Sequence, residues 1–244
     1  MYGLQEGSIV LVHASLKSLS RIPQHPAAVV SGIRKAIGNS GTLLMPALTY
    51  QRVTAEKPCF DVCTTPSNVG ALPEYFRNMQ GVERSLHPTH SVCAQGRYAR
   101  DFLRYHHLDN TPAGQHSPFS LLPSCGGKIL FLGCGLRPNT SMHAIEELVA
   151  PEYLFGEMVN YQVRDASGKL RQMRVRNHKF KGFEQRYERA ARLLGSGEIK
   201  EFKVLAAKSY LVDARALWRA AFKKLQQDPC YFVDRIWNDP VMAG

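Results

Sequence analysis

One short segment of the sequence pairs a histidine with a carboxylate at a spacing that could do chemistry. His143 and Glu146 lie three residues apart in Asn139-Thr140-Ser141-Met142-His143-Ala144-Ile145-Glu146-Glu147, so on a helix both side chains share one face. A carboxylate beside an imidazole fixes its tautomer and favours its protonated form, as a general base near neutral pH requires. Because the same spacing is common in surface pairs, both interpretations stay open on these residues alone.

A second histidine segment runs Arg84-Ser85-Leu86-His87-Pro88-Thr89-His90-Ser91-Val92. The proline after His87 restricts the backbone and predicts a fixed turn. A structural role is therefore expected for His87, and a solvated position for His90.

Other catalytic and metal-binding motifs are missing. The sequence has no GxSxG, GxxxxGK[ST] or HExxH segment. Gly133-Cys134-Gly135 lacks the third glycine of a dinucleotide fingerprint, and a tight turn is predicted there. The six cysteines form no CxxC pair, which predicts free thiols and no metal site. Cys93 is the candidate if a thiol reacts, but burial as a small apolar side chain is the favoured role.

Charge and composition describe a globular, basic protein. The 244 residues include 31 basic and 20 acidic side chains, giving a net charge of +11, and 44% of residues are hydrophobic. Residues 164–192 alone hold ten basic and three acidic side chains. RNA binding through this segment is an alternative, but no aromatic interleaving or known module supports it, so no nucleic-acid partner is predicted.

The basic segment begins with a predicted β-hairpin. Val159, Tyr161 and Val163 alternate with polar residues before a turn at residues 165–168, and Met173 and Val175 alternate after it. The odd positions should face the core, while the even positions present arginines outward.

The remaining pattern predicts a single α/β domain over residues 1–244, a layered sheet with helices on both faces. Alternation of short apolar runs with helical periodicity carries this prediction. Strands are expected at residues 8–13, 42–46, 91–95 and 128–133, and helices at 26–37, 98–106, 141–149, 183–194 and 213–227, with a helix entry at 65–68. No apolar run approaches the roughly 18 residues of a membrane span. With no secretory signal pattern at Met1 to Glu6, a cytoplasmic location without membrane contact is expected.

Six blocks of sequence, in order, resemble the aminoglycoside 3-N-acetyltransferase (antibiotic N-acetyltransferase) family. They cover about residues 9–150, and the remainder of the chain fits more loosely. The blocks are Val12-His13-Ala14-Ser15-Leu16-Lys17-Ser18-Leu19, Gly41 to Pro46 with Thr49, Phe60 to Arg77, Arg84 to Ser91, Ser117 to Leu122, and Asn139 to Glu146. The resemblance implies that family's fold, which is distinct from the general acetyltransferase fold.

The resemblance also implies a reaction, the transfer of an acetyl group from acetyl-CoA to a small-molecule amine without a metal. By match to the family motif, His143 takes the proton from the amine, and Glu146 orients and polarises His143. An amine is mostly protonated at neutral pH and cannot attack a thioester, so a base is needed. The oxyanion donor is not identified by the sequence, and backbone amides or the hydroxyls of Thr49 and Thr140 are the candidates.

The resemblance places acetyl-CoA on the opening loop and on the segment around His87. A turn between a strand and a helix offers backbone amides to phosphates, and Ser91 and Val92 would touch the pantetheine arm. The predicted contacts are His13, Ser15, Leu16, Ser18, Thr49, His87, Ser91 and Val92.

The acceptor amine is the least determined part of the reaction. Residues 102–145 contain one acid, Asp109, and a basic protein gains little from a polycationic ligand. A less cationic amine than an aminoglycoside is therefore expected, and a protein of the same fold that binds a ligand without catalysis is the alternative. The remaining carboxylates that could bind an acceptor ammonium are Asp61, Glu74, Glu147 and Glu157. The oligomeric state is not predicted.

Overall fold

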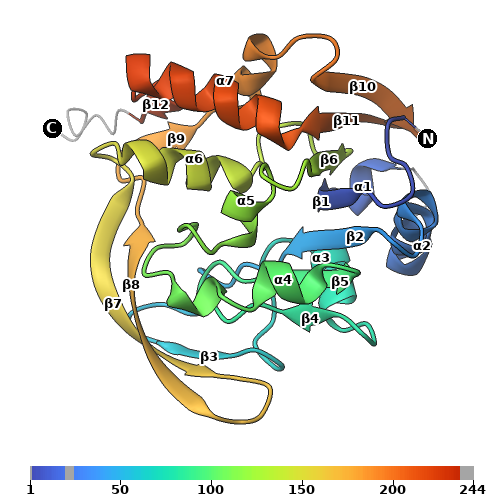
Figure 1. The fold of residues 1–244 in the computed structure, drawn as a ribbon. Helices are drawn as coiled ribbons and strands as arrows, with labels where there is room; N and C mark the ends of the chain where they lie inside the picture. The colour runs from blue at the N-terminus through green and yellow to red at the C-terminus, as the bar shows by residue number, and fades with distance from the viewer. Residues whose placement is uncertain (1, 20–24, 237–244) are drawn as a thin grey trace, which may run out of the picture.

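The computed structural model describes residues 2–19 and 25–236, and a seven-stranded mixed sheet forms their centre (Figure 1). The strand order is β10-β11-β6-β1-β2-β5-β4. The middle strands β6, β1 and β2 are parallel, whereas β11 and β5 run antiparallel on either side of them. The strands are β1 (Ile9–Ala14), β2 (Thr42–Pro46), β4 (Glu83–Arg84), β5 (Val92–Gly96), β6 (Lys128–Leu132), β10 (Ile199–Val204) and β11 (Ala207–Asp213).

Helices cover both faces of this sheet (Figure 1). One face carries α1 (Leu16–Leu19), α2 (Pro26–Ile37) and α3 (Ala71–Arg77). The other carries α4 (Ala99–Leu103), α5 (Pro118–Leu121), α6 (Ser141–Val149) and α7 (Ala214–Gln227), and the 3₁₀ turn η1 (His106–Leu108) lies between α4 and α5 in the chain. The predicted fold class, a layered α/β sheet with helices on both faces, is confirmed.

Each face of the main sheet packs against its helices in a separate hydrophobic core, because side chains alternate between the two faces along each buried strand. In β1, Leu11 packs with the α4–α7 side, whereas Val10 and Val12 pack with the α2–α3 side. Successive side chains of a strand point to opposite faces, so a strand covered on both faces is apolar throughout. Such burial holds the ends of the parallel strands in fixed positions.

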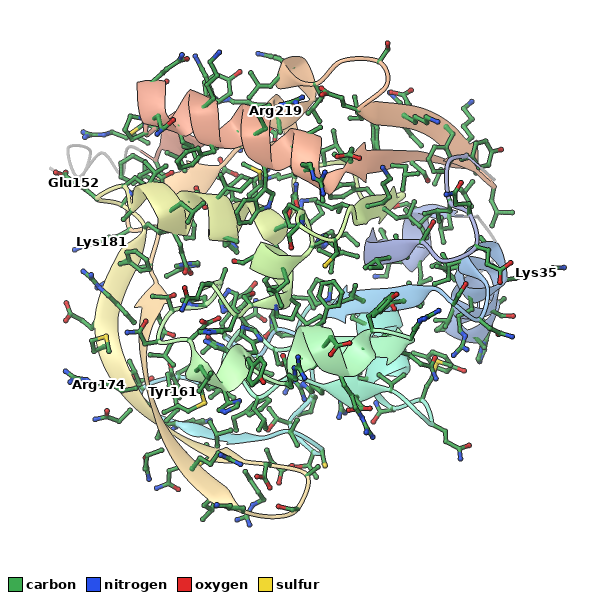
Figure 2. All side chains as sticks on the ribbon, viewed as in Figure 1. Lys35, Glu152, Tyr161, Arg174, Lys181 and Arg219 are labelled. Atoms are coloured by element: carbon green, nitrogen blue, oxygen red, sulfur yellow. The ribbon has the colours of Figure 1, made fainter. Side chains whose placement is uncertain are left out.

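A second sheet of β3 (Cys59–Asp61), β7 (Phe155–Arg164) and β8 (Leu170–His178) stands beside the first (Figure 1). The β7–β8 pair confirms the predicted hairpin. Tyr161, Val163 and Val175 are buried, and Tyr161 faces the body of the protein while Arg174 projects outward (Figure 2). The inner face of this hairpin becomes one wall of the pocket described below.

Most of the other predicted elements are found within a few residues of their expected bounds. Helix α2 matches its prediction fully: Pro26 occupies its first turn, and it ends at Gly38, whose φ of 67° suits a residue without Cβ. The helix predicted at 98–106 is shorter, because α4 ends at Leu103 and a 3₁₀ turn follows.

The helix predicted at 183–194 is found only in part and as another type of helix. Residues 183–185 form β9 (Phe183–Gln185), which pairs with β12 (Val233–Arg235), and η2 (Tyr187–Leu193) is a 3₁₀ helix. Arg186 and Arg189 both form ion pairs with Asp234, at 2.8 and 2.5 Å. Pairing with a distant strand therefore overrides the local helical pattern.

The remaining local predictions hold. Gly133 and Gly135 have φ of 67° and 66°, so the GxG segment is a turn after β6. All six cysteines are free, and burial raises the pKa of Cys93 to about 12, which makes it an unreactive thiol. In the part of the chain that the structure describes, no helix is long and apolar enough to span a membrane.

Candidate active site

A pocket of about 680 Å³ opens where the parallel strands of the main sheet end. Its walls combine the ends of β1 and β2, the loop after β6, the start of α6, and the inner face of the β7–β8 hairpin. The carboxyl edge of parallel strands is the usual place for a ligand in layered α/β proteins. The polar and charged lining residues include His13, Glu56, His90, Arg137, Thr140, His143, His178, Lys179 and Tyr187.

His143 lies on α6, and one of its ring nitrogens forms hydrogen bonds within the protein while the other is available to a ligand. The Tyr187 hydroxyl donates to Glu146 Oε2 at 2.7 Å, so its oxygen accepts from His143 Nδ1 at 3.0 Å. The same Nδ1 lies 3.4 Å from Glu146 Oε2. These contacts assign the proton to Nδ1 and leave the lone pair on Nε2. Nε2 of His143, which lines the pocket, is therefore the nitrogen available to accept a proton.

Glu146 is fully buried, and its carboxylate is satisfied by hydrogen bonds. Tyr153 donates to Oε1 at 2.9 Å, and Tyr187 donates to Oε2. A buried carboxylate is tolerable only with such donors around it. Its negative charge beside Nδ1 would stabilise His143 once the ring accepts a second proton. No sequence motif marked Tyr153 or Tyr187, because they reach Glu146 only through the fold.

His87 organises the loop that carries His90. The Nδ1 of His87 accepts hydrogen bonds from the backbone amides of Thr89 and His90, at 3.3 and 3.0 Å, and its Nε2 donates to the Thr111 carbonyl at 3.2 Å. Burial lowers the pKa of His87 to about 3, so the ring is neutral. The predicted structural role fits this placement, since His87 is fully buried and does not line the pocket.

The prediction of a solvated His90 is wrong. His90 is 6% exposed and lines the pocket, because the turn fixed by His87 and Pro88 directs it inward. Its ring stands 5.8 Å from that of His143 and 5.5 Å from that of His178, measured between centroids.

His178, at the end of β8, was missed by sequence reasoning. Its Nε2 donates to Glu147 Oε1 at 2.7 Å, and its ring lies 4.9 Å from that of His143. Its Nδ1 is buried without a hydrogen-bond partner among the described residues. Only the pairing of β7 with β8 brings it to α6, so no local spacing could have identified it.

Glu147 supports His178 and does not face the pocket itself. Its carboxylate also accepts from the Thr111 hydroxyl at 2.6 Å and from the Ala113 amide at 2.8 Å. Burial raises the pKa of Glu147 to about 7 despite these hydrogen bonds. The predicted contact of Glu147 with an acceptor ammonium is therefore replaced by a contact with His178.

The other three predicted acceptor carboxylates lie outside the pocket lining. Asp61 accepts from the amides of Cys63 and Thr64 and pairs with Arg164. Glu74 is bound by Arg77, and Glu157 lies exposed on β7. The structure does not bring the four acids together, and the carboxylate that lines the pocket, Glu56, was not predicted.

Apart from His87, described above, the predicted CoA contacts divide into two groups. His13 lines the pocket, stacked on Phe131 with ring centroids 5.2 Å apart, and burial lowers its pKa to about 3. Ser15, Leu16 and Ser18 follow it in the strand-to-helix turn that the sequence predicted, where the two serine hydroxyls are 2.9 Å apart.

The second group, Thr49, Ser91 and Val92, is buried behind the pocket wall. The Thr49 hydroxyl donates to the Pro88 carbonyl, and the Ser91 hydroxyl donates to the Ala47 carbonyl at 2.8 Å. Val92 is fully buried in β5. These contacts stabilise the wall, and none of the three residues lines the pocket.

The fold is that of known aminoglycoside acetyltransferases. The structure titled AAC-IIIb binary with CoASH superposes with a TM-score of 0.79 at 26% identity, covering 93% of this chain and 92% of that one. A histidine-to-alanine mutant of AAC(3)-IVa in complex with a gentamicin gives 0.76 at 26% identity, covering 95% and 86%. YokD from Bacillus subtilis, at 21% identity and a TM-score of 0.79, shares the fold.

The sequence model of the aminoglycoside 3-N-acetyltransferase family matches residues 11–226, and the chain belongs to this family. Aminoglycoside N(3)-acetyltransferase IX of Micromonospora chalcea is 27% identical over 256 residues, 92% of this chain and 89% of that protein. Aminoglycoside N(3)-acetyltransferase VII of Streptomyces paromomycinus is 30% identical over 163 residues, 60% of this chain but 56% of that protein. The match to the latter relative therefore spans about half its length.

The contacts of Glu74 predict a structural role that can be measured. Burial opposes its ionisation, but hydrogen bonds from Arg77, the Ser67 amide and Asn78 outweigh burial and lower the pKa of Glu74 to about 2. Because the folded pKa is depressed, the stabilisation is complete above the usual pKa of about 4.5 and is lost as pH falls towards 2.

Glu74→Gln should therefore lower the free energy of unfolding by about 1 kcal/mol at pH 7, allowing for solvent screening of a partly exposed pair. The difference from wild type should narrow in denaturant titrations below about pH 4. The KM for the acceptor should not change. A rise in that KM with stability intact would instead place Glu74 in acceptor binding.

Proposed function

We propose that this chain transfers an acetyl group from acetyl-CoA to a primary amine of a small molecule, with His143 as the general base. The observation that carries the proposal is the assigned tautomer of His143. Its Nδ1 is held by Tyr187 and faces Glu146, so its Nε2 lone pair is available in a pocket at the ends of the parallel strands. Family membership and the CoA complex of a relative support the same reaction.

The reaction then follows from these groups. The amine nitrogen attacks the thioester carbonyl while Nε2 of His143 takes the amine proton, and the buried Glu146 carboxylate stabilises the resulting imidazolium. The tetrahedral intermediate collapses by breaking the carbon–sulfur bond. The CoA thiolate leaves and takes the proton from His143, which restores the enzyme and releases the amide.

The oxyanion of the intermediate requires a donor at the pocket wall. Of the two hydroxyls considered from the sequence, Thr49 is committed to the Pro88 carbonyl and does not line the pocket. Thr140 lines the pocket at the start of α6, and its side chain makes no capping hydrogen bond. We assign the oxyanion donor to Thr140 for this reason.

The turn after β1 is the proposed entry for acetyl-CoA. His13 reaches the pocket, and Ser15, Leu16 and Ser18 continue outward from it. Lys17 on the same turn is exposed, which adds positive charge for the CoA phosphates.

The charge of the pocket favours an acceptor with few positive charges. Glu56 is the lining carboxylate among the described residues, and Lys179 lines the same pocket together with Arg137, which pairs with Glu184. A polycationic aminoglycoside would gain little from this balance. An amino sugar or another small amine with one or two ammonium groups fits it better.

Replacing His143 tests the role of the base. His143→Ala and His143→Gln should each lower kcat by about 10²-fold or more, the usual contribution of general base catalysis, with little change in the KM for acetyl-CoA. Release of the CoA thiol, followed with a thiol reagent, measures turnover. His107→Ala is the matched control, because His107 lies outside the pocket lining. Full turnover by both His143 variants would refute the assignment, and absence of thiol release from wild type with every amine would favour ligand binding without catalysis.

A panel of amines tests the acceptor. We expect kcat/KM for amino sugars with one or two amines to exceed that for aminoglycosides by about tenfold, which corresponds to roughly 1.4 kcal/mol in transition-state binding. Efficient acetylation of several aminoglycosides would contradict this expectation while leaving the acetyl transfer itself intact.

A further inference from the structure

We propose that His90, His143 and His178 together bind one divalent transition-metal ion such as Zn²⁺, at the wall of the same pocket. One ring nitrogen from each histidine lies within 4.8 Å of the corresponding nitrogens of the other two. Zinc is commonly bound by three histidines, with nitrogens about 2.0–2.1 Å from the metal. The three rings need to move only slightly to meet an ion placed between them.

The hydrogen bonds of the three rings leave suitable nitrogens free. His143 Nδ1 is held by Tyr187, His178 Nε2 by Glu147, and His90 lies with Nδ1 3.0 Å from the Thr89 hydroxyl. The nitrogens that remain are Nε2 of His90 and His143 and Nδ1 of His178. The last of these is buried with no partner among the described residues, which is unfavourable unless a ligand meets it.

The surroundings of the rings are those of metal-binding histidines. Such a histidine usually donates its second N–H to a carboxylate or another acceptor, which fixes its tautomer and orientation. Glu147 does this for His178, while Tyr187 and Glu146 do it for His143.

No sequence motif indicated this site, because metal motifs are recognised by short spacings. His90, His143 and His178 come from a loop, a helix and a strand that meet only in the folded chain. Cysteine spacing predicted no metal site, but it carries no information about histidines that only the fold brings together.

Metal binding and acetyl transfer should exclude each other at this site. An ion bound to Nε2 of His143 would occupy the lone pair that takes the amine proton, a consequence that rests on the proposed function. Three protein nitrogens would leave the fourth tetrahedral position to a water or to an incoming ligand. The ion is thus expected to inhibit the acetyl transfer reversibly.

Metal binding is tested on the full chain after treatment with EDTA. Calorimetric titration with Zn²⁺ should give one ion per chain, and Co²⁺ should give the visible absorption bands of a tetrahedral site. His90→Ala and His178→Ala should each weaken Zn²⁺ binding by about tenfold or more. His107→Ala should bind as wild type, and circular dichroism checks that each variant folds. Unchanged affinity in both pocket variants would show that the ion binds away from these histidines and would overturn the proposal.

The same protein preparation tests whether Zn²⁺ binding and acetyl transfer exclude each other. Acetyl transfer should fall as Zn²⁺ occupies the site, and EDTA should restore it. The same Zn²⁺ concentration should have less effect on any activity that His178→Ala retains. Acetyl transfer that requires added Zn²⁺ would overturn the exclusion, whereas no transfer under any condition would contradict the proposed function and leave the calorimetric result standing.

Discussion

The rest of the site depends on one buried charge, the carboxylate of Glu146. An uncompensated carboxylate at such a depth costs several kcal/mol, so the fold must supply donors to it. Tyr153 comes from the segment after α6 and Tyr187 from η2, and the Tyr153 hydroxyl also lies 3.2 Å from the Pro229 carbonyl near the end of the described chain. Satisfying Glu146 therefore ties the C-terminal third of the protein to the helix that carries His143.

Two consecutive glutamates on α6 serve two different histidines. Glu146 faces His143 on its own helix, whereas Glu147 crosses to His178 on β8. Neighbouring residues on a helix project in directions about 100° apart, which allows one turn to orient two rings that come from different layers. Because the carboxylates fix the rings, the nitrogen lone pairs in the pocket are determined by the fold before any ligand binds.

The features that could be predicted from the sequence are those that short-range sequence patterns determine. Alternating apolar residues located the buried strands and the inward face of the hairpin, and the spacing of His143 and Glu146 correctly placed these two side chains side by side on one helix. Contacts between segments that are distant in the sequence could not be predicted in this way. His178 and Tyr187 reach α6 through strand pairing, and β9 replaced a predicted helix because Asp234 and β12 hold it. Likewise, Asp61 and Glu74 accept hydrogen bonds from nearby amides and arginines and do not reach the pocket. The number and order of carboxylates in the sequence could not show this.

The most direct test of the role of Glu146 is kcat for acetyl transfer by Glu146→Gln. The variant keeps the size of the side chain and removes the charge that we propose stabilises the His143 imidazolium. Glu74→Gln makes the same chemical change outside the pocket lining and serves as the control. We predict a fall in kcat of about 10²-fold or more for Glu146→Gln, with the KM for acetyl-CoA nearly unchanged. A folded Glu146→Gln enzyme with the kcat of wild type would contradict that role.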